Sequence, residues 1–381
     1  MNWRVPLADL DFGEAESQAV LEVLNSRWLT MGAVTQEFEK QFAHLTGAKH
    51  ALAVSNATVA LHLACLGLGI GPGDEVIVPS LTFVATANAV LYTGAQVRFA
   101  DILGPGELTI SPEDIERQIT PRTRAVIVMH YGGYPCRMQA ILEVAARHGL
   151  AVIEDAAHAP GAFLDGRHLG AWGDVGCFSF FSNKNLVTGE GGMLITDRDD
   201  IAEKARLQRS HGMTSLSWDR HQGHAYSYDV VTLGYNYRID EIRSALGLVQ
   251  LQKLAANNEL RKRITERYWS AFAGSELGLP FRETSTALGM NPAYHIFPML
   301  LPLGVDRSAF IDLLRTAGVQ TSFHYPPVHR FSYYANRFPG VVLPNTESVA
   351  ARQVTLPLYP GMQAASVDWV IHSVCRALEN D

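Results

Sequence analysis

The sequence predicts an α/β protein: a mostly parallel, seven-stranded sheet with helices on both faces, followed by a smaller α+β domain. Three observations support this prediction. Between Ala51 and Thr196, short apolar runs alternate with helical patterns, which is typical of a parallel sheet. The runs are almost continuously apolar, as strands covered on both faces should be. A long helical stretch, Ile239 to Tyr268, then precedes a region with a different pattern.

The strands and helices between Ala51 and Thr196 can each be predicted from local sequence patterns. The predicted strands are Ala51–Val54, Glu75–Val78, Val97–Ala100, Ala125–Met129, Ala151–Glu154, Cys177–Phe180 and Met193–Thr196. Helical patterns lie between them at Val59–Leu68, Ala85–Tyr92, Pro112–Ile119 and Met138–His148. Ser111 before Pro112 marks a helix start, because serine is a good N-cap and proline suits the first helical position. Residues that follow the strands fall at the edge where such sheets bind ligands.

The second region begins within the long helical stretch, which suits a connector between domains. Beyond it we expect a strand-like run at His295–Leu301, a helix at Arg307–Ala317 and a closing helix at Val367–Leu378. The predicted division is a large domain at residues 1–250 and a small one at 251–381.

Composition excludes several classes of protein. The chain has 381 residues, of which 47% are hydrophobic, and a formal net charge of −7. A disordered protein would combine low hydrophobicity with high net charge. Asp and Glu (38) outnumber Lys and Arg (31), so we expect no nucleic-acid or membrane partner.

The sequence also bears on compartment and metal binding. Residues 1–11 carry two aspartates and no apolar core, so a secretory signal is not expected. The uncharged stretches 51–73 and 76–97 are interrupted by Pro, Gly, Asn and Thr, which favours buried strand and helix over a membrane span. The four cysteines form no C-x-x-C pair, and His221 and His224 have no nearby Cys or Glu, so we expect no disulfide or metal site. The cytoplasm is the expected compartment.

One lysine stands apart from the others. Lys184 follows a buried aromatic run that ends in Phe180 and Phe181, and a glycine-rich turn comes after it. Burial there would lower its pKa and supply the neutral amine that a Schiff-base nucleophile requires. The alternative is a structural lysine that pairs with a nearby carboxylate. The remaining lysines are expected at the surface: Lys40, Lys49, Lys204, Lys253 and Lys262.

Two further groups complete a candidate site. Asp155, at the end of a strand, could keep the ring nitrogen of pyridoxal phosphate protonated, or it could cap the next helix. His158 could belong to the site or be a hydrogen-bonded core histidine. Residues 55–58 lie between a strand and a helix and could bind phosphate through backbone N–H groups, or they could simply form an N-cap. The glycines of 67–73 follow a helix and lack dinucleotide-loop spacing, which argues against an NAD(P)-dependent oxidoreductase.

Together, these motifs resemble the DegT/DnrJ/EryC1/StrS aminotransferases, pyridoxal-phosphate enzymes of fold type I. The likeness runs almost end to end. It rests on Gly71–Pro79, Thr82–Asn88, Glu154–His158, Ser179–Asn185, Thr188–Gly192, Gly234–Arg238, His324–Tyr325, His329 and Leu356–Met362.

The resemblance implies a role for each matched position. Lys184 would hold the cofactor as a Schiff base and shuttle a proton, and Asp155 would pair with the pyridine nitrogen. Phe83 would stack on the ring, and His158 would lie near its phenolic oxygen. The phosphate would be held by Ala57, Thr58 and Ser179, with Asn236 from the neighbouring subunit of a homodimer.

The resemblance also implies a substrate class. His158, where many members have glutamine, and Thr188-Gly189-Glu190 are similar to the branch that aminates C-4 of keto sugars. We therefore expect transfer from L-glutamate to a nucleotide-diphosphate 4-keto-6-deoxy sugar. Candidate substrate-binding residues are Trp28, Thr30, Met31, Arg220, Arg238, His324, Tyr325 and His329.

Two alternatives stay open at this point: amination of another ketone, and a catalytically silent regulator. The enzyme could aminate a 3-keto sugar nucleotide or an inosose of aminocyclitol synthesis. A dehydratase branch carries histidine at the lysine position, so Lys184 favours transamination. A catalytically silent regulator would not need both Lys184 and Asp155.

Overall fold

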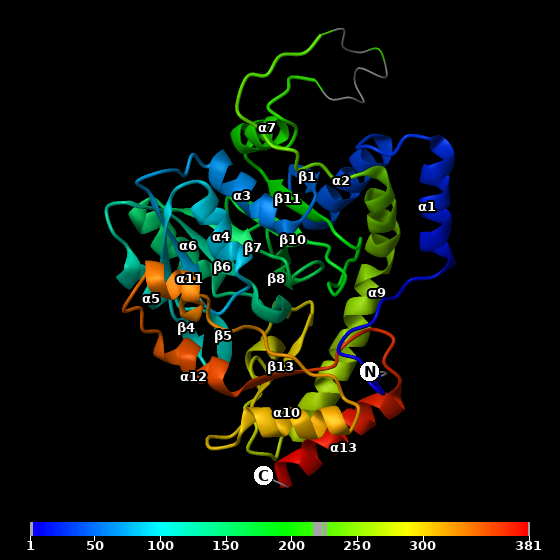
Figure 1. Ribbon diagram of the computed structural model, residues 1–381, viewed down its shortest axis with the longest axis vertical. Coiled ribbons are helices and arrows are strands. Elements are labelled where there is room, and N and C mark those ends of the chain that lie inside the picture. The colour runs from blue at the N-terminus through cyan, green and yellow to red at the C-terminus, as the bar shows by residue number, and fades with distance from the viewer. Residues whose placement is uncertain (1–2, 216–222, 224–226, 380–381) are drawn as a thin grey trace.

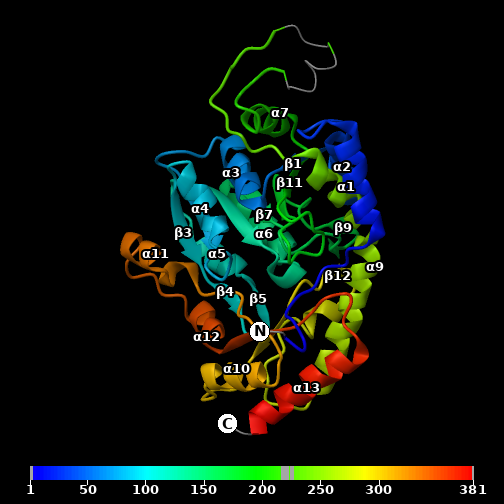
Figure 2. The same ribbon diagram turned by 45° about the vertical axis from the view of Figure 1, so that its right-hand side comes forward.

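The computed structural model describes residues 3–215, 223 and 227–379. A layered α/β part and a smaller, mainly helical part are joined along one long helix, α9 (Glu241–Phe272) (Figure 1). In the turned view, α9 runs along one side of the molecule from α2 towards α13 (Figure 2). Among the described residues, no helix combines the length and apolar character that crossing a membrane requires.

The central sheet contains seven strands in the order β1-β11-β10-β7-β6-β2-β3. Only β11 is antiparallel to its neighbours β1 and β10, and the other pairs are parallel. The seven strands predicted from the sequence are the seven that form this sheet. Their bounds are β1 His50–Val54, β2 Glu75–Pro79, β3 Gln96–Ala100, β6 Thr123–Met129, β7 Ala151–Asp155, β10 Val175–Ser179 and β11 Gly192–Thr196.

Alternate residues of these strands enter two separate cores. Val76 and Val78 of β2 pack on one face, whereas Ile77 packs on the other. This double burial explains why the strands are apolar without interruption. The first face is covered by α3 (Ala57–Gly67), α4 (Ala85–Tyr92) and α7 (Asp199–Gln208), and the second by α2 (Ala33–Thr46), α5 (Pro112–Gln118) and α6 (Met138–His148). Ser111 caps α5 as predicted, since its Oγ accepts a hydrogen bond from the Asp114 N–H.

Helix α9 belongs to both parts of the molecule. Its N-cap is Asp240, whose side chain accepts from the Arg243 N–H, and it continues through residue 250 without a break. Leu254 packs in a core beneath the sheet, while Tyr268 and Phe272 pack in the core of the smaller part. That smaller part contains β13 Phe297–Leu300 paired antiparallel with β14 Gln353–Leu356, α10 Arg307–Thr316 and α13 Ala364–Glu379.

Part of the C-terminal region returns to the large sheet. Val328, Tyr334 and Leu343 are buried in the same core as α3 and α4. This segment contains two short helices, α11 (Ser332–Arg337) and α12 (Pro344–Arg352). The remaining elements are α1 Glu14–Ser26, β4 Ile102–Gly104, β5 Glu107–Ile110, β8 Phe163–Leu164, β9 Arg167–His168, β12 Met290–Asn291 and the 3-10 turns η1 Tyr131–Gly133, η2 Thr284–Thr286 and η3 Val328–Arg330.

Candidate active site

An open cavity of about 820 Å³ lies at the carboxyl-terminal edge of the sheet. It is lined by residues that follow strands: Ala57 after β1, Phe83 after β2, Ala157 after β7 and Lys184 after β10. These strands run in one direction, so their ends meet at one edge, where open α/β sheets bind ligands. The structure therefore brings together the residues that the sequence predicts for the cofactor within one chain, whereas Asn236, predicted to come from a neighbouring subunit, lies outside this cavity.

Lys184 is held in the loop that follows β10. Its backbone N–H donates to the Phe181 carbonyl at 2.9 Å, and its side chain lines the cavity. Burial lowers the pKa of Lys184 to about 8, against the opposing effect of the Asp155 carboxylate. Within the described part of the chain, Lys184 forms no salt bridge. The alternative of a structural lysine paired with a carboxylate is thus not supported, and a neutral amine is accessible near pH 8.

Asp155 is the last residue of β7, and its carboxylate is buried. Thr86 Oγ1 donates to Oδ2 at 2.7 Å, and the Ala157 N–H donates to Oδ1 at 3.2 Å. Burial raises the pKa of Asp155, whereas these two hydrogen bonds and the charge of Lys184 act to lower it. Each oxygen retains a lone pair, so the carboxylate can accept a further N–H from the cavity.

His158 lies beside Asp155 and is buried. Its Nδ1 accepts a hydrogen bond from the Gly132 N–H at 3.1 Å, and its Nε2 lies 2.8 Å from the Tyr325 hydroxyl. Burial and the charge of Lys184 hold the pKa of His158 well below its usual value, so the ring is neutral. A neutral ring that accepts at Nδ1 carries its proton on Nε2 and donates to Tyr325. The Tyr325 proton is then available to a group in the cavity.

The start of α3 faces the same cavity. Asn56 caps the helix, because its Oδ1 accepts from the Val59 N–H at 3.1 Å. The N–H groups of Ala57 and Thr58 have no hydrogen-bond acceptor among the described residues, and they lie at the positive end of the helix dipole. Behind them, Gly192 approaches so closely that a Cβ would lie 2.8 Å from the Ala57 nitrogen. The turn is therefore both an N-cap and a suitable anion site.

Aromatic side chains surround the opening. Phe83 is 55% exposed although it is a large apolar residue, and its ring centroid lies 6.0 Å from that of Tyr325. Tyr237 also lines the cavity, with its hydroxyl 3.1 Å from His62 Nδ1. Ser179, at the end of β10, lines the cavity beside Lys184. An exposed aromatic face of this kind is suited to stacking against the planar ring of a ligand.

The other predicted site residues are placed differently. Tyr325 and His324 line the cavity, and burial lowers the pKa of His324 to about 4. His329 is instead buried between Ser80 and Glu347. The residues that lie outside the cavity lining are Trp28, Thr30, Met31, Asn236, Arg238 and His329. Arg220, together with His221 and His224, lies outside the described residues.

Several contributors were not predicted from the sequence. Thr86 orients Asp155 by donating a hydrogen bond to it. The four-residue spacing of Thr82 and Thr86, whose hydroxyls hydrogen-bond to each other, is the sequence feature that could have predicted a polar contact here. Glu154 is fully buried and accepts from His130 and from the backbone N–H groups of Gly170, Trp172 and Gly173. This carboxylate fixes the end of β7 next to Asp155, and nothing in the sequence distinguished it from its neighbour.

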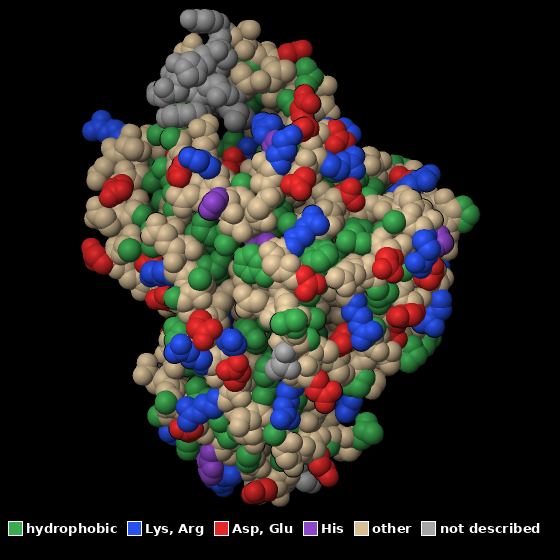
Figure 3. Space-filling model, turned by 180° about the vertical axis from the view of Figure 1, so that it is seen from behind, with side chains coloured by type: hydrophobic (Ala, Val, Ile, Leu, Met, Phe, Trp, Pro, Cys, Tyr) green, Lys and Arg blue, Asp and Glu red, His purple; other side chains and the backbone are tan. Residues whose placement is uncertain are grey.

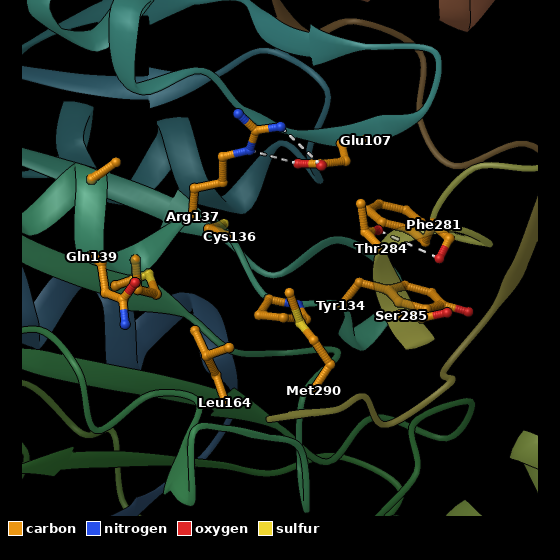
Figure 4. Close-up of a pocket in the computed structure, with 13 residues that line it drawn as sticks. Glu107, Tyr134, Cys136, Arg137, Gln139, Leu164, Phe281, Thr284, Ser285 and Met290 are labelled. Atoms are coloured by element: carbon orange, nitrogen blue, oxygen red, sulfur yellow. Dashed lines mark hydrogen bonds and ion pairs between the residues drawn. The ribbon is translucent and has the colours of Figure 1, made fainter. Parts of the chain in front are cut away.

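A second, smaller cavity of about 290 Å³ lies elsewhere, near Tyr134 and Phe281 (Figure 4). These two rings stack with centroids 4.2 Å apart. Its charged groups pair with each other, since Arg137 donates to both carboxylate oxygens of Glu107 at 2.9 and 3.0 Å (Figure 4). Among the described residues, no group of three or more His, Cys, Asp or Glu could hold a metal ion.

Comparison with known proteins identifies the family and the fold of the chain. A model of the DegT/DnrJ/EryC1/StrS aminotransferase family matches residues 11–375. The chain belongs to this family. Its members depend on pyridoxal phosphate, so the protein is a pyridoxal-phosphate-dependent aminotransferase of fold type I. The predicted family, fold class, enzyme class and cofactor are confirmed, which argues against a silent regulator and an oxidoreductase.

Solved structures of this family are similar over almost the whole chain. TlmJ from Streptoalloteichus hindustanus, an aminotransferase, is 35% identical with a TM-score of 0.91, and the match covers 99% of each chain. DesV from S. venezuelae is 36% identical with a TM-score of 0.88, and 98% of each chain is covered. Spr1654 from Streptococcus pneumoniae, in its PLP form, is 26% identical with a TM-score of 0.91, and 99% of each chain is covered.

Proposed function

We propose that this aminotransferase moves an amino group from L-glutamate to C-4 of a nucleotide-diphosphate 4-keto-6-deoxy sugar, in amino-sugar biosynthesis. The observation that carries the proposal is His158, buried in the cavity against Tyr325, at the position where the sequence resembles the C-4 branch of the family. The neutral His158 ring donates its one N–H to Tyr325, which leaves the Tyr325 hydroxyl to donate into the cavity, and it adds no positive charge beside Lys184.

The residues of the cavity fit pyridoxal phosphate. The free N–H groups of Ala57 and Thr58, with Ser179, suit its phosphate. Asp155 has a lone pair for the ring nitrogen, and the exposed face of Phe83 suits the ring. Lys184 has the unpaired amine that the aldehyde requires. When bound, the cofactor supplies the electron sink that lets an amino group pass between the two substrates.

The side chains of this chain supply the proton transfers. Lys184 Nζ, with a pKa of about 8, would accept the proton from the α-carbon of the amino-acid donor and pass it to the cofactor carbon C4′; in the second half-reaction it would move a proton from C4′ to the carbon that receives the amine. The buried Asp155 carboxylate would hold a proton on the cofactor ring nitrogen. Thr86 keeps that carboxylate in place.

We infer a homodimer with shared active sites. Exposed apolar side chains precede Asn236 in the sequence: Val230 (56%), Val231 (56%) and Leu233 (78%). Such a cluster is suited to burial against a second copy. Asn236 is itself exposed and lies outside the cavity of its own chain, so it is available to the phosphate site of the partner.

Mixing two inactive variants tests the shared site. Lys184→Ala and Asn236→Ala protomers, each impaired alone, should recover activity when dissociated and reassembled together, because one of the two sites then has both groups. Size-exclusion chromatography with light scattering would report the dimer. A monomer, or mixtures with no recovery, would contradict the shared site.

The sugar nucleotide requires positive partners for its diphosphate, and Arg220 and Arg238 are the candidates. The segment with Trp28, Thr30 and Met31, together with His324 and Tyr325, would border the sugar, whereas His329 is buried against Ser80 and Glu347 and is not retained as a sugar contact. The face of the molecule in Figure 3 mixes acidic and basic side chains without a large area of one sign. This face therefore offers no broad basic surface for the diphosphate, and we expect a few arginines to bind it.

A panel of ketones tests the substrate. Purified holoenzyme with L-glutamate should convert 4-keto-6-deoxy sugar nucleotides, detected as 2-oxoglutarate and by NMR of the amino product. A 3-keto sugar nucleotide and an inosose are the alternative substrates. Preferential turnover of either would replace the proposed substrate while leaving the aminotransferase intact.

A further inference from the structure

Behind the cavity, a chain of buried polar side chains connects His158 with the loop that carries Lys184. His295, only 3% exposed, lies between them. Its ring centroid is 4.3 Å from that of His158. Its Nδ1 is 2.9 Å from Oδ1 of Asn185, the residue directly after Lys184. None of these contacts with His295 was predicted from the sequence.

Two backbone carbonyls fix the direction of the hydrogen bonds that connect these buried side chains. Asn185 Nδ2 donates to the Ala293 carbonyl and to Asn258 Oδ1, both at 2.7 Å. Asn258 Nδ2 donates to the Pro160 carbonyl at 3.0 Å. Because carbonyls can only accept, the oxygen of Asn185 faces His295, and His295 must carry its proton on Nδ1.

The backbone of His295 is tied to the same site from the other side. Its N–H donates to the Gly132 carbonyl at 2.8 Å, and the Gly132 N–H donates to His158 Nδ1. His295 thus contacts the Lys184 loop through its side chain and the His158 site through both its ring and its backbone. A shift of His295 would move both sides of the cavity.

We propose that His295 and Asn185 are positioning residues that set the location of the Lys184 amine relative to His158. The hydrogen bond between His295 and Asn185 joins two uncharged side chains. The groups that face His295 are His158, His324, Lys184 and Arg261, and together with burial they hold the pKa of His295 well below its usual value. The proposal rests on the role of Lys184 proposed above, but it does not depend on which ketone the enzyme aminates.

His295 and Asn185 differ from ordinary core residues because their hydrogen bond holds the loop that carries Lys184. Lys184 lies in a loop rather than in a strand, so side-chain contacts from Asn185 are needed to hold it. Loss of the Nδ1–H donor would leave the Asn185 oxygen buried without a partner. The loop could then relax, and water would reach the amine and raise the pKa of Lys184.

Two substitutions at His295 separate the hydrogen bond from the volume. His295→Leu removes the donor but keeps a similar size. His295→Asn places an amide N–H near the position of Nδ1 and should restore the bond to Asn185. Competitive acetylation of the full-length, cofactor-free protein, read by mass spectrometry across pH, measures the pKa of Lys184 directly. Steady-state assays of the holoenzyme give kcat and KM.

The expected pattern is specific. His295→Leu should raise the pKa of Lys184 by about one unit and lower kcat about tenfold, with KM for the keto substrate within about twofold. His295→Asn should recover most of both losses. A lysine pKa that does not move in His295→Leu, or an asparagine variant no better than leucine, would overturn the proposal.

Neighbouring asparagines on α9 provide a second test that does not alter His295. Asn258 supports Asn185, whereas Asn257 is equally buried and donates to Asp11 instead. Asn258→Ser should raise the pKa of Lys184 and lower kcat, while Asn257→Ser should change neither. Equal effects of the two substitutions would show general destabilisation and contradict positioning. Retained activity in Lys184→Ala would instead contradict the proposed function itself.

Discussion

The charged groups of the two cavities differ: those of the smaller cavity pair with each other at the surface, whereas the amine of the larger cavity is buried and unpaired among the described residues. In the smaller one, Arg137 and Glu107 neutralise each other through two hydrogen bonds. In the larger one, Lys184 has no ion-pair partner among the described residues, and burial lowers its pKa to about 8. An unpaired buried amine is costly for the fold and useful for chemistry. The comparison predicts that changes at Lys184 affect activity, whereas changes at Arg137 affect only stability.

The largest expected effect is that of Lys184→Ala. Lys184 is the one lysine among the described residues that line the larger cavity, so kcat should fall at least about 10³-fold. Lys184→Arg should be similarly inactive, because a guanidinium does not deprotonate to a nucleophilic amine. Rates of 2-oxoglutarate formation from glutamate measure both variants.

The matched control is Arg137→Ala. Its side chain lies in the other cavity, so kcat should remain within about twofold of the wild-type value. If Arg137→Ala reduced kcat as strongly as Lys184→Ala, the distinction between the two cavities would be wrong.

Asp155→Asn is expected to have the next largest effect, a loss of about 10²-fold in kcat. The substitution keeps the size of the side chain but removes the charge that would hold a proton on the ring nitrogen. Thr86→Ser, which keeps the hydroxyl that donates to Asp155, should stay within about threefold. An Asp155→Asn enzyme as fast as Thr86→Ser would show that this carboxylate is structural.

The sequence predicted much of this site because parallel sheets place function at strand ends. Continuous apolar runs located all seven strands, and the residues just after them line the cavity. The exceptions are contacts between segments far apart in the chain. His295 beside Asn185, and Tyr325 beside His158, are separated by 110 and 167 residues. No local pattern encodes such pairs, because they depend on how the smaller part packs against the sheet.

The same limit applies to the fold. Residues 328–343 re-enter the core of the large sheet through Val328, Tyr334 and Leu343. Their sequence contains two Tyr, two Phe and one Pro-Gly pair and has no clear helical or strand pattern. Helix α9 was expected as a connector, but its packing against both parts follows only from tertiary structure, since its buried residues change from one side to the other along its length.

The cost of burying Lys184 should be measurable as stability. Its pKa is about 8 in the folded protein against an ordinary value of 10.5. Below pH 8 the folded protein must hold the charged amine in a site that disfavours it; because Lys184 is partly exposed at the cavity wall, this cost is about 2 kcal/mol. Lys184→Met removes this cost, so the cofactor-free variant should be more stable than the wild type at pH 7.

The difference in unfolding free energy between the wild type and Lys184→Met should depend on pH. Between pH 8 and 10.5 the unfolded chain binds more protons at Lys184 than the folded protein does, so wild-type stability rises with pH relative to Lys184→Met. Urea unfolding at pH 7 and pH 9.5 should show the difference shrinking. A difference that stays constant with pH would mean that methionine acts through packing rather than through charge.

The smallest expected effect belongs to the ion pair of the second cavity. The Arg137 side chain is 53% exposed, so the pair with Glu107 is screened by solvent and should contribute about 0.2–1 kcal/mol to the free energy of unfolding. A double-mutant cycle with Arg137→Gln and Glu107→Gln, followed by urea unfolding, isolates this coupling. It should weaken in high salt, with kcat unaffected. A coupling that persists in high salt and carries a loss of kcat would mean that the second cavity communicates with the first, and its charges could no longer be regarded as purely structural.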